Sequence, residues 1–158
     1  SFDELIMIGL VHEIFGISVG SRIWSLRQKE KLAYDVGSQY NTSKYNVIFR
    51  AAIGTDTSKV QTALASLVRE YKKLYDSGIT GAELATAKIN MKNNLIYRID
   101  IKQNRVSNMA LYEYFGYGYK LTNDLIKGVD NANLAGVNAF IKKYYNPDNL
   151  YTAIVGKK

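Results

Sequence analysis

Apolar side chains recur every three or four residues through most of the chain, the spacing of amphipathic α-helices. Two helix starts carry a capping box, in which a hydroxyl residue is followed three positions later by Glu: Ser1 with Glu4, and Thr80 with Glu83. Gly78 is expected to close the helix before the second box. Helices are predicted over residues 2–16, from about 21, and over 57–78, 81–97, 104–115, 122–127 and 131–144, the last two capped by Thr122 and Asn131.

The pattern changes to that of β-strands in two parts of the chain. Residues 34–40 and 45–53 are rich in residues that favour strands and flank the turn 41–44, which predicts an antiparallel hairpin. Residues 150–155 follow a turn at 146–149 and predict a final strand. Together these elements predict one α+β domain that is rich in helix.

Composition limits the chemistry that the chain can perform by itself. Its 158 residues suffice for one domain, and they include no Cys and a single His, His12. A hydrolytic zinc centre usually takes two or three His with a carboxylate, and a serine triad needs a suitably placed His. We therefore expect no metal site and no self-contained hydrolytic site within this chain.

The net charge of +7 arises from 21 basic and 14 acidic residues that are spread along the sequence. Such a distribution favours a solvated surface over a nucleic-acid interface. The Tyr-rich segment 112–119 favours packing at a helix end, with stacking on bases or on peptide side chains as the alternative. The apolar run 5–11 is too short to span a membrane.

Three segments carry a resemblance to a known family. Residues 21–34 combine Ser-Arg-Ile-Trp, Leu-Arg and Leu-Ala-Tyr, residues 78–84 read Gly-Ile-Thr-Gly-Ala-Glu-Leu, and residues 144–150 read Tyr-Tyr-Asn-Pro-Asp-Asn-Leu. In this order and spacing they resemble the C-terminal, non-catalytic half of M16 zinc peptidases, the group of pitrilysin, insulin-degrading enzyme and mitochondrial processing peptidase. The resemblance extends over nearly the whole chain.

The resemblance implies a two-layer α/β sandwich, with an antiparallel-containing sheet packed under the helices of residues 57–97. It makes residues 1–158 a single, partial half-domain whose first strands would precede Ser1. Such an unfinished sheet is expected to self-associate through its open edge. Cell-envelope members are common in the family, so the resemblance favours the periplasm or envelope of a bacterium, while the sequence itself leaves the compartment open.

The resemblance also assigns roles to Arg27 and Tyr34. In catalytic members an Arg and a Tyr seven residues later reach from the non-catalytic half to the peptide substrate, while zinc is held by the other half. Without the resemblance, Arg27 is a helix-surface residue that pairs with Glu30, and Tyr34 is an aromatic residue at the start of a strand. The segment His12-Glu13 matches the family's His-x-x-Glu-His zinc motif poorly, because no second His follows.

The sequence also allows two functions other than a role in a peptidase. Relatives that have lost peptidase chemistry can keep the fold as a structural or assembly module. The other alternative is a basic protein that binds nucleic acid through the Tyr-rich segment. A His-x-x-Glu-His motif in the same protein or in a partner chain would decide for a peptidase. A mobility shift with DNA that depends on the salt concentration would decide for nucleic-acid binding.

Overall fold

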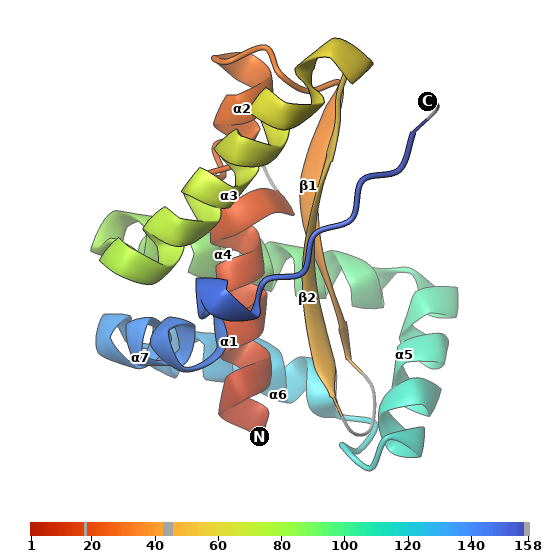
Figure 1. Ribbon diagram of the computed structural model, residues 1–158. Helices are drawn as coiled ribbons and strands as arrows, with labels where there is room; N and C mark the ends of the chain where they lie inside the picture. The colour runs from red at the N-terminus through yellow and green to blue at the C-terminus, as the bar shows by residue number, and fades with distance from the viewer. Residues whose placement is uncertain (18, 43–45, 157–158) are drawn as a thin grey trace.

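An antiparallel hairpin lies against a layer of helices in the computed structural model, which describes residues 1–17, 19–42 and 46–156 (Figure 1). The elements, in chain order, are α1 (Phe2–His12), the π-helical turn η1 (Glu13–Ile17), α2 (Trp24–Gln28), β1 (Asp35–Thr42), β2 (Val47–Gly54), the 3-10 turn η2 (Thr57–Lys59), α3 (Val60–Ser77), α4 (Gly81–Asp100), α5 (Lys102–Tyr114), α6 (Leu121–Gly128), η3 (Val129–Asn131), α7 (Leu134–Tyr144) and η4 (Pro147–Asn149).

The two strands of the hairpin pair in a regular register, from Asp35 opposite Gly54 to Thr42 opposite Val47. Val36 and Ser38 of β1 are buried, and Phe49 and Ile53 of β2 are half-buried on the same side. The alternating residues are more exposed, so the hairpin covers the helices with one face only. Helices on one face of an antiparallel sheet are the predicted α+β arrangement.

Helix α1 forms the centre of the core. Ile6, Ile8, Leu10 and Val11 are all buried, and they lie on more than one side of the helix. A helix that is apolar around most of its circumference must be covered from several directions. It contacts α4, α6, α7 and β1, and Figure 1 shows it near the middle of the molecule.

Both predicted capping boxes are present. The hydroxyls of Ser1 and Thr80 accept hydrogen bonds from the backbone N–H of Glu4 and Glu83, and each Glu side chain bonds back to its cap residue. Gly78 ends α3 with φ of 66°, a left-handed value that favours glycine. These local signals therefore place the helix ends correctly.

The caps predicted for the last two helices are wrong. Thr122 lies inside the first turn of α6, where it is buried, and α6 has no side-chain cap. Asn131 belongs to the 3-10 turn η3, and the cap of α7 is Asn133, whose side chain accepts from the N–H of Gly136. The 3-10 turn uses the residues that sequence spacing assigns to the start of α7.

The predicted strand over residues 150–155 is also wrong, because these residues form no strand in the structure. They run as an extended segment, with Tyr151 and Val155 almost fully exposed. A strand needs a neighbour for its backbone hydrogen bonds, and the sheet of the described residues contains β1 and β2 alone. Ser18, between the first two predicted helices, lies outside the described residues, as do Ser43 and Lys44 of the predicted turn 41–44 and Tyr45 at the start of the predicted second strand.

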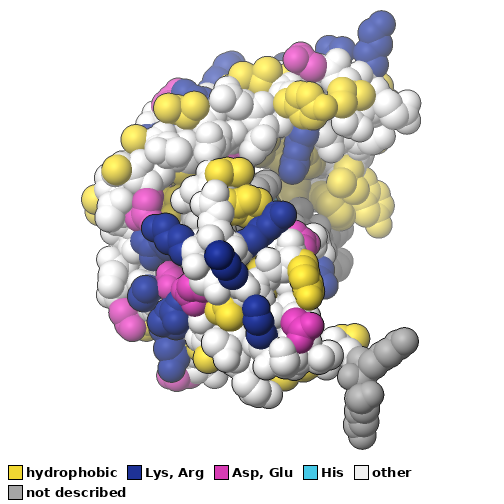
Figure 2. Space-filling model, turned by 90° about the horizontal axis from the view of Figure 1, so that it is seen from above, with side chains coloured by type: hydrophobic (Ala, Val, Ile, Leu, Met, Phe, Trp, Pro, Cys, Tyr) yellow, Lys and Arg dark blue, Asp and Glu magenta, His cyan; other side chains and the backbone are white. Residues whose placement is uncertain are grey.

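Among the described residues, no helix is both long and apolar enough to cross a bilayer. Figure 2 shows Lys and Arg side chains spread over the face viewed, with Asp and Glu among them. This face therefore carries no single basic patch.

Candidate functional site

Arg27 lies in the last turn of α2 with an exposed side chain. Its guanidinium carbon is 5.0 Å from the centroid of the Trp24 ring, within the range of a cation–π contact. The pairing with Glu30 that sequence spacing predicts is wrong, because Glu30 binds Arg69 instead. A guanidinium carries five N–H donors, so an exposed Arg can donate to the carbonyl or carboxylate of a ligand.

Tyr34 directly precedes β1, and its side chain is 71% exposed. Its backbone N–H donates to the carbonyl of Gly54 at 2.8 Å, which joins it to the end of the hairpin. The phenol therefore projects from a fixed backbone position, an arrangement that suits a donor to an external acceptor.

The loop between Arg27 and Tyr34 is held from both sides. The N–H of Leu32 donates to the carbonyl of Leu26 at 3.0 Å, and the hydroxyl of Thr55 donates to the carbonyl of Leu32 at 2.5 Å. Lys31 takes a left-handed backbone conformation, with φ of 51°. This unusual angle turns the loop so that α2 and β1 are joined within a few residues.

Glu30, in the same loop, is bound to α3. Its two carboxylate oxygens accept from Arg69 at 2.5 Å and from the hydroxyl of Ser66 at 2.9 Å. Arg69 also contacts the buried carboxylate of Glu70, which pairs with Lys73 at 2.9 Å. Sequence analysis missed this network, because charged residues on one helix face are typical of a solvated surface.

Arg22 makes a second long-range anchor, at the start of the motif. Its Nε and Nη2 bind the two carboxylate oxygens of Glu83 at 2.7 and 2.9 Å, and Nη2 also donates to the carbonyl of Gly78 at 2.7 Å. Burial by itself would raise the pKa of Glu83, but the guanidinium and the N–H of Thr80 outweigh it and hold the pKa below its usual value. The turn before α2 is thereby joined to the capping box of α4.

His12 is buried and occupied by structural contacts. Its Nδ1 lies 2.8 Å from the hydroxyl of Ser38, and its ring meets that of Tyr40 edge to face. Burial is the main cause that lowers the pKa of His12 to about 4, and the positive charge of Arg98 acts in the same direction. Burial also raises the pKa of the adjacent Glu13, whose Oε1 accepts from Asn94 at 2.7 Å.

These residues do not fit a metal ion. His12 faces a hydroxyl and an aromatic ring, and within residues 1–17, 19–42 and 46–156 no group of three His, Asp or Glu side chains could hold one. A zinc ion of this family would therefore need ligands from outside the described part of the chain.

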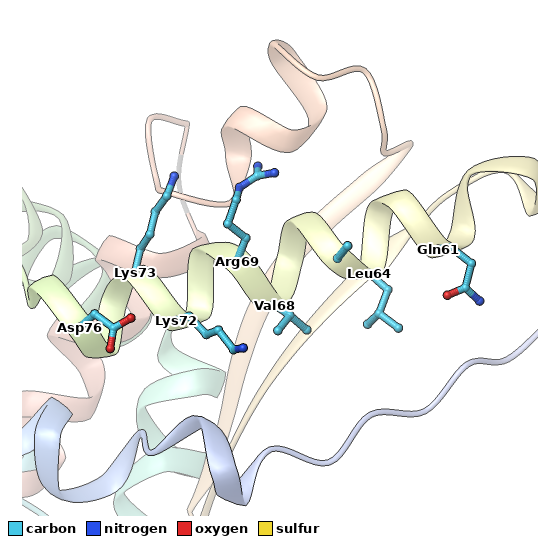
Figure 3. Close-up of a pocket in the computed structure, with 8 residues that line it drawn as sticks. Gln61, Leu64, Val68, Arg69, Lys72, Lys73 and Asp76 are labelled. Atoms are coloured by element: carbon cyan, nitrogen blue, oxygen red, sulfur yellow. The ribbon is translucent and has the colours of Figure 1, made fainter.

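The surface of α3 has a shallow hollow of about 580 Å³ (Figure 3). All eight residues that line it belong to this one helix, and they include Arg69, Lys72 and Lys73. A hollow lined by one helix is a stretch of helix surface and lacks the convergent walls of a binding site. A larger groove of about 1060 Å³ lies between α3, β2 and the chain from Asn149 to Val155.

Fold and site together define a helix-rich α+β domain in which an exposed Arg and an exposed Tyr flank an anchored loop. The model of the peptidase M16 inactive domain matches residues 3–91, more than half of the chain. The chain belongs to this family.

Two curated relatives are similar over most of the chain. One is named uncharacterized zinc protease YmxG, from Bacillus subtilis, and is 23% identical over 88% of this chain. The other is named non-peptidase homolog YmxG, from Helicobacter pylori, and is 27% identical over 92% of this chain. The chain spans 34% of the length of each.

Solved structures support the fold at low sequence identity. The peptidase M16 inactive domain from Pseudomonas fluorescens matches with a TM-score of 0.79 and 19% identity, over 92% of this chain and 34% of that one. An inactive peptidase domain from Bordetella parapertussis matches with a TM-score of 0.78 and 16% identity, over 92% of this chain and 80% of that one. The α+β class expected from the sequence is thus confirmed.

Proposed function

We propose that residues 1–158 form most of the non-catalytic half of an M16-type zinc metallopeptidase. In this proposal the chain packs against a zinc-bearing half, in the same polypeptide or in a partner subunit, and the two halves enclose a peptide substrate. Membership of the inactive-domain family supports the role. The zinc would belong to the other half.

Arg27 and Tyr34 are the residues proposed to contact the substrate. The observation that carries this assignment is that both side chains are exposed at the two ends of one loop whose backbone is fixed by hydrogen bonds. A guanidinium and a phenol both donate hydrogen bonds, so they can hold a peptide carbonyl and the negative charge that develops on it during hydrolysis.

Glu30 is proposed to position this loop. Its bonds to Arg69 and Ser66 fix the loop relative to α3, a long and rigid element. Donors that are already in place lose little freedom when they bind a transition state. The loop therefore serves as a rigid support for the two donors.

The test uses the full-length polypeptide together with any partner subunit, and a peptide substrate that it cleaves. Tyr34→Phe is expected to lower kcat/KM by roughly 10 to 1000-fold, and Arg27→Ala is expected to lower it as well. Tyr114→Phe and Arg105→Ala, at exposed positions on α5, serve as matched controls and should leave kcat/KM unchanged. Parental activity in both site variants would refute the assignment.

A second function is favoured by one specific observation. The relative from Helicobacter pylori, 27% identical to this chain, is named a non-peptidase homolog. A structural or assembly module would keep the fold and its contact with a partner half but cleave no peptide. Full-length protein that forms the complex, binds zinc in its other half and cleaves no unfolded peptide would favour this alternative.

A further inference from the structure

Trp24 and Arg27 lie three positions apart on α2, so their side chains leave the same face of the helix. The guanidinium carbon of Arg27 lies over the indole of Trp24, 5.0 Å from the ring centroid. No carboxylate or carbonyl of the described residues accepts a hydrogen bond from this guanidinium. Within that part of the chain, the ring of Trp24 is therefore the group that holds the cation.

Helix α2 is short, yet it is fixed on the molecule. Ile23 and Leu26 are fully buried, and the helix contacts β1 and α3. The turn before it is tied to α4, since Arg22 binds the carboxylate of Glu83. Trp24 is half-buried and packs against the core, so its ring is a fixed surface for the side chain that lies over it.

The indole N–H of Trp24 indicates that this position uses the ring face and not a hydrogen bond. Nε1 is buried, and no acceptor among the described residues lies within hydrogen-bond distance of it. A buried donor without a partner destabilises the fold, and Trp usually has a partner when it is buried. A smaller apolar side chain would occupy part of the same space without that penalty, but it would lack the aromatic face that binds a cation best.

The two neighbouring arginines are paired with carboxylates. Arg22 binds Glu83, and Arg69 binds Glu30, the acidic residue nearest in sequence to Arg27. A carboxylate partner cancels the charge of a guanidinium, whereas an aromatic face attracts the cation and leaves its charge intact. Arg27 therefore keeps the positive charge that stabilisation of an oxyanion requires.

We propose that Trp24 is a positioning residue for Arg27. The indole face holds the guanidinium in the orientation in which it donates to the substrate carbonyl, and it restricts this long side chain before the substrate arrives. An exposed Arg without such a contact loses more conformational freedom on binding. The inference rests on the proposed contact of Arg27 with the substrate and adds the group that keeps Arg27 in place.

The test measures kcat/KM of the full-length polypeptide, with any partner subunit, on a peptide that it cleaves. Trp24→Leu removes the ring face and should lower kcat/KM by roughly 3- to 30-fold, the range of one cation–π contact. Trp24→Phe keeps a ring and should restore most of this activity. Tyr75→Leu is the matched control: it removes a half-buried ring of α3 whose centroid lies 4.2 Å from Nζ of Lys142, and it should leave kcat/KM unchanged.

A double-mutant cycle separates positioning from a general effect on the fold. In the Arg27→Ala background, Trp24→Leu should cause no further loss, because the ring has no guanidinium left to hold. An equal loss in both backgrounds would overturn the inference and leave the assignment of Arg27 standing. Parental activity of Trp24→Leu beside an impaired Arg27→Ala would do the same. Parental activity of Arg27→Ala would instead refute that assignment, and this inference with it.

A measurement on the parent protein keeps the test independent of how well Trp24→Leu folds. The ring current of an indole shifts the NMR signals of protons above its face upfield. The Nε–H signal of Arg27, identified by its loss in Arg27→Lys, should therefore lie upfield of that of Arg105, an exposed residue of α5. Equal proton shifts of the two arginines would overturn the inference.

Discussion

His12 should make the stability of this domain fall between pH 8 and pH 5. Its pKa is lowered from 6.5 to about 4 in the folded state, mainly by burial and secondly by Arg98. Between these two values the unfolded chain binds the proton more readily than the folded one does. Stability is therefore full above about pH 6.5, decreases as the pH falls, and has lost the whole contribution below about pH 4.

The size of the effect follows from the two pKa values. A difference of about 2.5 between them corresponds to about 3 kcal/mol once the pH is below both, and to about 2 kcal/mol at pH 5. His12 is only 8% exposed, so solvent screening reduces this value little. Protonation of His12 would also put a positive charge between Ser38 and Tyr40, where the positive charge of Arg98 repels it.

The assay is urea denaturation of the parent and of His12→Asn at pH 8 and pH 5. Asn keeps a polar atom near the position of Nδ1, so the contact with Ser38 is conserved while the titrating group is removed. The parent should lose about 2 kcal/mol more than the variant between the two pH values. Other titrating groups, such as Glu13 and Glu83, are present in both proteins and cancel in the difference. The same loss in both proteins would refute the reasoning.

Three further predictions concern the end of α3, the ion pair of Arg22 with Glu83 and the binding of zinc. Gly78→Ala should destabilise the domain by about 2 kcal/mol or more in urea denaturation, because φ is left-handed and a Cβ would lie 2.4 Å from Oδ1 of Asn138; Gly81→Ala, with open space around its Cβ, should be neutral. Arg22→Met should cost about 1–3 kcal/mol in the same assay, because it leaves the half-buried carboxylate of Glu83 without its strongest partner; an unchanged denaturation midpoint would contradict this. Residues 1–158 should retain less than one equivalent of zinc after dialysis, as measured by elemental analysis, and a tight one-to-one site would overturn this expectation.

The sequence by itself determined the elements whose signals are local. A capping box depends on two residues three positions apart, and Gly78 ends α3 through its own backbone freedom. The hairpin likewise depends on two neighbouring runs of strand-forming residues around one turn. Such signals survive without knowledge of the rest of the molecule, which explains why the helix ends at Ser1, Gly78 and Thr80 are correct.

The candidate site depends both on the sequence and on the tertiary structure. Arg27 and Tyr34 were found through the resemblance, since neither stands out by composition or spacing. The partner of Glu30 was missed, because α2 ends at Gln28 and Glu30 therefore does not lie on the same helical face as Arg27. Its actual partner, Arg69, is 39 positions away and is brought near only when α3 packs beside the loop.

Tertiary structure alone decided whether residues 150–155 form a strand and how readily His12 is protonated. The segment has the composition of a strand, but a strand exists only where a neighbour supplies backbone hydrogen bonds, and the described residues place none beside it. The protonation of His12 likewise depends on burial against Ser38 and on the distant charge of Arg98. Pairing and desolvation are properties of the folded assembly of segments, so local sequence cannot fix them.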